Sequence, residues 1–117
     1  MKNADCIFCK IVEGTIPSTK VFENDKVLAF KDLRPNASIH YLFIHKNHTK
    51  DVNDMSSTDP QQFAEIFAGI KFVTEKENLI EKGFRVVSNS GPHAGQTVFH
   101  THFHVLAGEP LNGFGSR

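Results

Sequence analysis

Three histidines stand at every second position near the end of the chain: His100, His102 and His104. In an extended strand such alternate side chains point to one face, so the spacing predicts three neighbouring imidazoles. The intervening Thr101, Phe103 and Val105 would then face the core. Because imidazole has an unperturbed pKa of about 6.5, such a row can supply metal ligands, a nucleophile or a proton donor. A strand can carry histidines merely as its solvated face, but three histidines this close together favour a functional site.

Two cysteines near the start of the chain, Cys6 and Cys9, are separated by two residues. Such a pair can form a redox couple, but that motif normally follows a strand, and nothing strand-like precedes it here. Two thiolates can also bind zinc when the fold supplies two further ligands. His45, His48 and the histidine run are candidates for these ligands, so spacing alone leaves both the redox and the zinc interpretations open.

The loop before the histidine run, residues 91–96, contains two glycines and can present backbone N–H groups to an anion. Beside a row of imidazoles, such a loop indicates a phosphate held next to a nucleophile. Phosphoryl and nucleotidyl transfer depend mainly on positioning and charge neutralisation, and histidine can carry the transferred group covalently. His40, on an earlier expected strand, could add a hydrogen bond to this site.

The elements that must position these residues can be predicted from apolar periodicity. Helical spacing predicts a short helix over 7–12, which Gly14 can end in the left-handed conformation. Capping residues at 56–59 followed by Pro60 predict the start of a long amphipathic helix that continues to about Glu77. Strands are expected at 20–23, 26–30, 38–45, 84–87 and 98–106. Together these elements indicate an α+β fold: an antiparallel β meander, a short N-terminal helix and one long helix that covers one face of the sheet.

Composition limits the partners. Thirteen basic and thirteen acidic side chains balance in the 117 residues, and no basic run occurs. Without a positive field, long nucleic acid is not an expected partner. No segment approaches the ~20 apolar residues that cross a bilayer, and the N-terminus lacks the apolar stretch of a secretory signal. We therefore expect a cytoplasmic protein with one domain over residues 1–117 and no membrane partner.

The run from His100 to Leu106 resembles the His-x-His-x-His-x-x signature of the histidine triad (HIT) nucleotide-binding proteins. The resemblance includes Cys-Ile-Phe-Cys-Lys-Ile-Val at 6–12, Ala-Phe-Lys-Asp-Leu-Arg-Pro at 29–35, His40, His48 and the segment 89–98. It covers nearly the whole chain and is greatest with the purine nucleoside phosphoramidase branch. It implies a HIT-like fold and a hydrolase or transferase, like adenosine 5′-monophosphoramidases, that acts on purine nucleotides through a covalent nucleotidyl-histidine.

The resemblance also implies individual roles. His102 matches the nucleophile that attacks the α-phosphorus, and His104 and His40 match residues beside the phosphate and the leaving group. Thr97 matches a hydroxyl that hydrogen-bonds one of these groups, and Asp32 matches the carboxylate that holds the ribose hydroxyls. The implied nucleotide contacts are Ile7, Phe8, Ile11, Phe30, Asp32, Leu33, Leu42, Asn89, Gly95, Gln96, Thr97, His102 and His104.

A structural zinc ion is implied by the same resemblance. Its ligands would be Cys6, Cys9, His48 and His100, which leaves His102 free for chemistry. Such an ion would fix the N-terminal helix to the triad strand and stabilise the fold. The resemblance and the small size of the chain also predict a homodimer.

Three features depart from the family pattern. His45 stands where proline is frequent and could compete with His48 for the metal, and His93 adds a base to the phosphate loop. The short tail at 111–117 lacks a tryptophan-proline segment. Three other functions stay open: dinucleoside polyphosphate cleavage by the same histidine, hydrolysis by metal-activated water, and a nucleotide-binding regulatory module with little activity.

Overall fold

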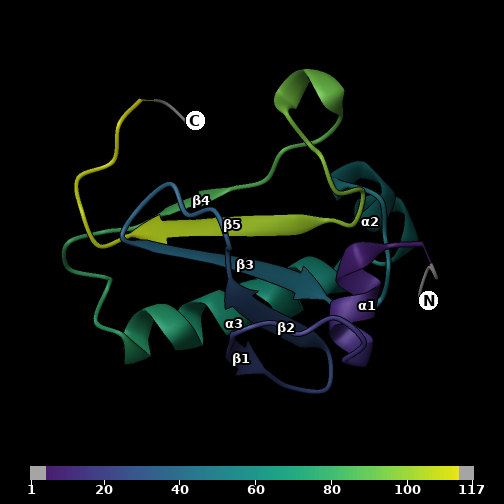
Figure 1. Ribbon diagram of the computed structural model, residues 1–117, viewed down its shortest axis with the longest axis horizontal. Coiled ribbons are helices and arrows are strands. Elements are labelled where there is room, and N and C mark those ends of the chain that lie inside the picture. Colours follow the sequence, from purple (N-terminus) through teal and green to yellow (C-terminus); the bar gives the residue numbers. More distant parts are fainter. Residues whose placement is uncertain (1–4, 114–117) are drawn as a thin grey trace.

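A five-stranded antiparallel sheet forms the centre of the computed structural model, which describes residues 5–113 (Figure 1). The strands are β1 (Lys20–Glu23), β2 (Val27–Lys31), β3 (Ile39–His45), β4 (Arg85–Val87) and β5 (His102–Ala107). The helices are α1 (Ile7–Glu13), α2 (Val52–Thr58), α3 (Gln61–Lys76) and the 3-10 turn η1 (Pro92–Ala94). The strand order is β1-β2-β3-β5-β4, so β5 lies between β3 and β4. The expected α+β class is confirmed.

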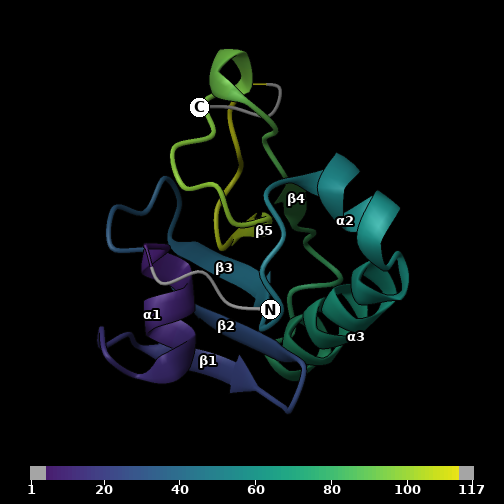
Figure 2. The ribbon, with the colours of Figure 1, turned by 90° about the vertical axis from the view of Figure 1, so that its right-hand side faces the viewer.

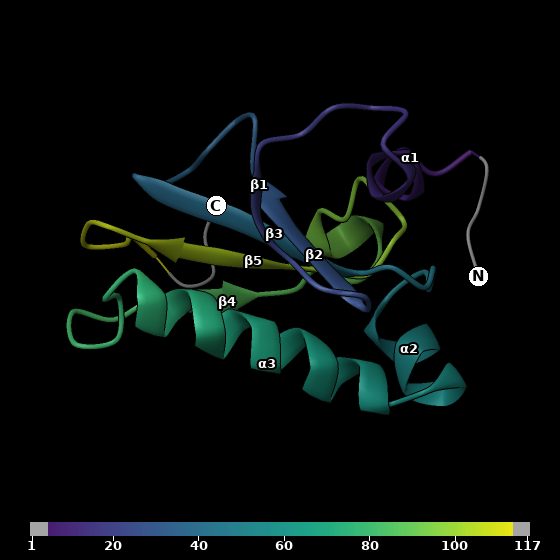
Figure 3. The same cartoon turned by 90° about the horizontal axis from the view of Figure 1, so that it is seen from below.

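The two faces of the sheet are buried in two different cores. Along β3, Tyr41 and Phe43 enter a cluster that includes Ile66 of α3, whereas Leu42 and Ile44 enter a cluster with side chains of α1. This division arises because successive side chains of a strand point to opposite faces. Figure 2 and Figure 3 show α3 along one side of the sheet and α1 on the other. The long helix covers one face as expected, and the short helix covers only part of the second.

The helix α1 is too short to be stable by itself, so its position depends on its caps and on packing. The Cys6 thiol caps the N-terminus by accepting a hydrogen bond from the Cys9 N–H at 3.3 Å. Gly14 ends the helix in the left-handed conformation with φ of 86°, as expected. Phe8 and Ile11 are buried in the apolar cluster with β2 and β3. The helix therefore presents both its cysteines and its apolar face to the rest of the fold.

The prediction that residues 56–60 start the long helix is wrong in detail. Residues 56–58 are the end of α2, whose N-cap is Asp51; its carboxylate accepts an N–H hydrogen bond at 2.9 Å from the first turn. Asp59 is extended, and its carboxylate accepts the Gln61 N–H at 3.1 Å at the start of α3, whose N-cap residue is Pro60. A single helix was predicted because α2 has only seven residues and one buried side chain, which gives a weak periodic signal.

The predicted strand over 98–106 begins four residues later than expected, at His102. Its partner β3 ends at His45, which pairs with β2, and the pairing of β3 with β5 begins at Ile44 and His102. The residues before His102 do not pair with β3, and the Thr101 N–H donates instead to the Thr49 carbonyl at 2.8 Å. His100 therefore lies before the strand, not in line with the other two histidines. The intervening residues 101, 103 and 105 are buried, as expected.

None of the helices within residues 5–113 is long and apolar enough to cross a membrane. Positions 114–117 of the short glycine-containing tail lie outside the described residues.

Candidate active site and metal centre

A cavity of about 540 Å³ lies beside α1. One part of its wall is apolar and includes side chains of α1, β2 and β3, while the polar part includes Asp32 and the last two triad histidines. Of the residues predicted to contact a nucleotide, the following line it: Ile7, Phe8, Ile11, Phe30, Asp32, Leu33, Leu42, Thr97, His102 and His104. Leu33 is 93% exposed and can serve only at the rim. The arrangement can hold an apolar ring system at one end and an anionic group at the other.

Further lining residues were not found from the sequence: Ile16, Pro17, Ser18, Lys31, Arg34 and Val98. Lys31 and Arg34 flank Asp32 in sequence, and this adjacency was the signal that could have identified them. Residues 16–18 connect α1 to β1 and carry no such signal, because only the docking of α1 on the sheet brings this connection to the cavity.

His102 lines the cavity with a defined ring orientation. Its Nδ1 lies 2.7 Å from the His100 carbonyl oxygen, which can only accept, so Nδ1 carries the proton and donates. The neutral ring therefore keeps its lone pair on Nε2. Burial lowers the pKa of His102, which favours this neutral form. The edge-to-face contact with the Phe8 ring, at a centroid distance of 5.1 Å, further restrains the imidazole. The unprotonated Nε2 of His102 is thus available at the polar part of the cavity.

A second histidine pair, His40 and His104, forms a chain of directed hydrogen bonds. The Asn36 N–H donates to Nδ1 of His40 at 3.0 Å, so His40 carries its proton on Nε2. That Nε2 lies 2.8 Å from Nδ1 of His104 and donates to it, which leaves the His104 proton on Nε2. The pKa of His104 is lowered to about 4, mainly by burial and then by the neighbouring His102 and His40. In its neutral form His104 therefore offers an N–H donor.

Asp32 connects this pair to the mouth of the cavity. One carboxylate oxygen accepts the Arg34 N–H at 2.8 Å, and the other lies 3.4 Å from Nε2 of His40. A carboxylate has about four acceptor positions, so Asp32 keeps capacity for a ligand hydroxyl. His40 itself is buried behind the cavity wall and reaches it through His104.

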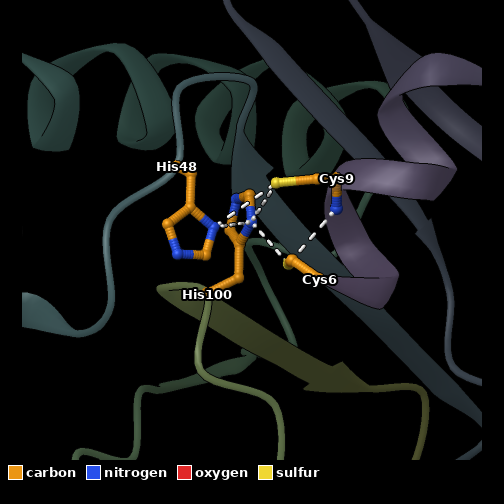
Figure 4. A group of neighbouring side chains, drawn as sticks. All are labelled: Cys6, Cys9, His48 and His100. Atoms are coloured by element: carbon orange, nitrogen blue, oxygen red, sulfur yellow. Dashed lines mark hydrogen bonds between the residues drawn. The ribbon is translucent and has the colours of Figure 1, made fainter. Parts of the chain in front are cut away.

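The four predicted metal ligands come together at the N-terminus of α1 (Figure 4). Their ligand atoms, the thiol sulfurs of Cys6 and Cys9 and a ring nitrogen of His48 and His100, all lie within 4.8 Å of one another. The distances from Nδ1 of His100 are 3.3 Å to the Cys6 sulfur, 3.6 Å to the Cys9 sulfur and 3.2 Å to Nδ1 of His48.

These separations fit a tetrahedral ion. Bonds of about 2.0–2.3 Å to nitrogen and sulfur place neighbouring ligand atoms about 3.3–3.8 Å apart. His100 is also in the required tautomer, because its Nε2 donates to the His45 carbonyl at 2.9 Å and its Nδ1 lone pair faces the thiols. Burial lowers the pKa of His100 to about 4 and also lowers that of His48, so both rings favour the neutral form that binds metals. The donor set is therefore suited to a metal such as zinc.

Comparisons with known proteins agree with this geometry. The family model described as the HIT domain matches residues 13–111. The chain belongs to the HIT domain family. It is 37% identical over 107 residues to the purine nucleoside phosphoramidase of Escherichia coli K12, which covers 92% of this chain and 90% of that protein.

Solved structures of HIT proteins match over nearly the whole length. A histidine triad protein from Clostridium difficile gives a TM-score of 0.93 at 42% identity, covering 97% of this chain and 99% of that one. A HIT family hydrolase from Clostridium thermocellum gives 0.92 at 36% identity, covering 98% and 100%. The HIT-like fold is thereby confirmed.

In this HIT domain the loop 91–96 does not present the open row of N–H groups that the sequence suggested. The N–H groups of Ala94 and Gln96 donate to the Gly91 carbonyl, and that of Gly95 donates to the Pro92 carbonyl. The Gly91 N–H donates to the side-chain oxygen of Gln96, whose NH₂ group donates to two backbone carbonyls. Gln96 therefore holds the loop together.

The other predicted residues of this HIT domain are placed as follows. Gly95 and Asn89 do not line the cavity, and Asn89 is half-buried just after β4. His45 does not compete for the metal: its Nε2 lies 2.7 Å from the Glu65 carboxylate, and its Nδ1 accepts the Asn47 N–H. His93 is exposed in η1, outside the cavity.

The buried His104 makes the stability of this HIT domain depend on pH. Its folded pKa is about 4, whereas an exposed histidine titrates near 6.5. Between these values the unfolded chain binds more protons, so stability falls as the pH decreases from about 6.5 to 4. We expect the melting temperature of His104→Asn to fall less steeply over this range than that of the parent, as measured by calorimetry. His93→Ala, which changes an exposed histidine, should keep the parental slope; an unchanged slope in His104→Asn would contradict the effect.

Proposed function

We propose that this chain is a hydrolase that cleaves purine nucleoside phosphoramidates or adenylylated substrates through a covalent nucleotidyl-histidine on His102. The observation that carries the proposal is the hydrogen bond from Nδ1 of His102 to the His100 carbonyl. It leaves Nε2 as a free nucleophile at the polar part of a cavity whose opposite wall suits a purine. The phosphoramidase and the HIT family hydrolase among its relatives support the same reaction class.

The reaction begins when Nε2 of His102 attacks the α-phosphorus. The bond from phosphorus to Nε2 forms, the bond to the leaving amine breaks, and the amine takes a proton as it departs. The negative phosphate raises the pKa of the adjacent His104, so His104 takes up a second proton together with the substrate and gives the proton on Nε2 to the amine. Water then attacks the phosphorus and passes its proton to the vacated Nε2 of His104, and the bond from phosphorus to His102 breaks, which releases the nucleoside monophosphate and free His102. In the resting site His40 keeps the proton of His104 on Nε2.

The nucleoside contacts follow the resemblance to the family and the cavity wall. Asp32 holds the ribose hydroxyls, for which its carboxylate keeps acceptor capacity. Thr97, exposed at the cavity edge, hydrogen-bonds the phosphate or the leaving group. The base packs between α1 and Leu42. For Asn89 and Gly95, phosphate contact is supported by the resemblance alone.

Zinc is proposed as the metal of the cluster formed by Cys6, Cys9, His48 and His100. A bound ion would cross-link α1 to the triad segment and add stability, and the proposed chemistry does not use it. Neither Cys6 nor Cys9 forms a disulfide, which suits a reducing compartment and supports a cytoplasmic location.

A homodimer is also proposed. The strand β4 is an edge of the sheet, and an unpaired edge is a ready template for pairing with another strand. On the neighbouring α3, Phe67 is 43% exposed while its ring packs on Phe103 of β5. A symmetric contact between two copies would cover both features.

A second substrate class is supported by two cations. Lys31 and Arg34 line the cavity, and neither forms an ion pair within residues 5–113. Such charges would favour a polyanionic leaving group, as in a dinucleoside polyphosphate. Rates on an adenosine phosphoramidate and a dinucleoside tetraphosphate decide which leaving group the site prefers.

Replacing His102 by alanine should reduce turnover of an adenosine phosphoramidate by at least about a thousandfold, because the nucleophile is lost. Mass spectrometry of protein quenched during turnover should find an AMP adduct on His102 in the parent. The matched control, His93→Ala, should keep parental turnover.

Full activity of His102→Ala would remove His102 as the nucleophile. A slow parent without any adduct would instead indicate a regulatory binding module. Loss of turnover when zinc is removed from protein that stays folded, together with the absence of an AMP adduct on His102 in the active zinc-loaded protein, would favour metal-activated water.

We expect one zinc ion per chain by elemental analysis of the purified protein. Cys9→Ser should weaken zinc binding by at least about tenfold, because a thiolate ligand is lost, whereas Ser18→Ala should leave it unchanged. Equal zinc affinity in Cys9→Ser and the parent would contradict the assigned ligands.

Sedimentation equilibrium should give the mass of two chains at micromolar concentration. Val86→Pro removes an N–H from the edge strand and should weaken this association if β4 forms the contact. A monomer at all concentrations would overturn the proposed dimer.

A further inference from the structure

The metal centre and the nucleotide cavity share the helix α1. Cys6 caps this helix and Cys9 lies in its first turn, while Ile7, Phe8 and Ile11 form part of the cavity wall. Because the helix has seven residues, the cysteines and the wall cannot move independently. Any ion that holds the two sulfurs also holds the wall against which the base would pack.

The two sites also share the residue His100. The His100 ring takes part in the cluster through Nδ1 and is fixed from behind by the hydrogen bond from Nε2 to the His45 carbonyl. Its own carbonyl accepts the proton of Nδ1 of His102 at 2.7 Å. The Phe8 ring contacts both imidazoles edge-on, with centroid distances of 5.9 Å to His100 and 5.1 Å to His102. The orientation of the proposed nucleophile therefore depends on the residue that the metal would hold.

The cluster adjoins a hollow in the surface of the described residues. Cys9 and His100 are buried, with 1% and 0% exposed, whereas Cys6 and His48 line a surface hollow of about 300 Å³. Ile7, Thr97 and Val98 line both this hollow and the nucleotide cavity. A metal ion can therefore exchange through the hollow, separated from the nucleotide by a thin wall of side chains.

We propose that metal binding at the Cys6–Cys9–His48–His100 cluster and nucleotide binding in the cavity are positively coupled, through α1 and through the peptide between His100 and His102. Without the ion, a nucleotide must itself order the helix and the nucleophile, and this ordering lowers its affinity. With the ion bound, α1 and the His102 ring are already ordered before the nucleotide arrives. Coupling of this kind is reciprocal, so the nucleotide must strengthen metal binding by the same factor. This inference rests on the proposed nucleotide site.

The test uses AMP as the nucleotide and zinc as the metal. Calorimetric titration should give AMP affinity about tenfold higher for the zinc-loaded protein than for folded, metal-free protein, within the usual range of allosteric coupling. Competition with a chromophoric chelator should show zinc affinity raised by the same factor when AMP is saturating. The ¹⁵N shifts of His102 report its tautomer, which should be single in the loaded protein and mixed in the metal-free protein.

Two variants distinguish a metal that positions the nucleotide site from a metal that only stabilises the fold. His48→Ala removes a ligand that does not line the nucleotide cavity, and its AMP affinity should fall to the metal-free value. His48→Cys keeps four ligands of a kind that binds zinc and should restore both the AMP affinity and the single His102 tautomer. His93→Ala, a matched histidine control outside the cluster, should behave like the parent.

Equal AMP affinity in loaded and metal-free protein, with zinc still raising the melting temperature, would overturn the coupling and leave the metal a purely structural role. Absence of AMP binding in every form would instead overturn the proposed function. If metal-free protein does not fold, the coupling is tested by the rate of zinc transfer from loaded protein to the chelator. AMP should slow this transfer more than inorganic phosphate does, since phosphate does not reach the wall of α1; equal rates would overturn the proposal.

Discussion

The hydrogen bond between Nδ1 of His102 and the His100 carbonyl is the constraint on which the candidate site depends. Its length of 2.7 Å and its burial make the alternative tautomer costly, because a buried carbonyl would lose its donor and face a lone pair. The carbonyl is itself held by the His100 ring, which donates to His45 on β3. A single proton position on His102 is thus set by segments that lie far apart in the sequence.

Burial and charge act together in the pocket. Burial lowers the pKa of His40, His102 and His104, so the site at rest holds neutral rings with fixed donors and acceptors. Asp32 is the one acidic side chain that lines the cavity within the described residues, and Lys31 and Arg34 add positive charge. A phosphate entering such a site supplies the negative charge that histidines need in order to accept protons. A bound phosphate would thus shift the pKa values of these histidines in the direction opposite to that of burial.

The helix α1 combines three tasks in seven residues. It carries the cysteines of the candidate metal centre, forms part of the cavity wall and covers an apolar area of the sheet. Such a short helix is unstable alone, so it exists only while these contacts hold it. This dependence is the physical reason to expect that a metal ion, the fold and a bound nucleotide influence one another. The long helix α3 packs on the opposite face and contributes no residue to the cavity wall.

The sequence by itself determined the α+β class, the existence of the strands β1 and β2, the left-handed end of α1 at Gly14 and the candidate chemistry of the histidines. These features depend on the types of residues and on their spacing over a few positions, so they can be predicted from the sequence. It did not determine the separate helix α2, because Asp51 and Asp59 act as caps only in the observed backbone. Nor did it determine the internal bonding of the loop 91–96, in which Gln96 accepts the Gly91 N–H and the N–H groups of residues 94–96 donate to loop carbonyls.

Tertiary structure decided how the triad is divided. Spacing alone put all three imidazoles on one strand face, but β5 pairs with β3 only from His102 onward, because the Thr101 N–H donates to the Thr49 carbonyl beyond the end of β3. His100 thereby joins the thiols of α1, His102 turns to the cavity, and His104 meets His40 across the strand pair. The alternation of residues fixes which side chains share a face of a strand, whereas the length of a strand is set by its partner, and that partner exists only in the folded chain.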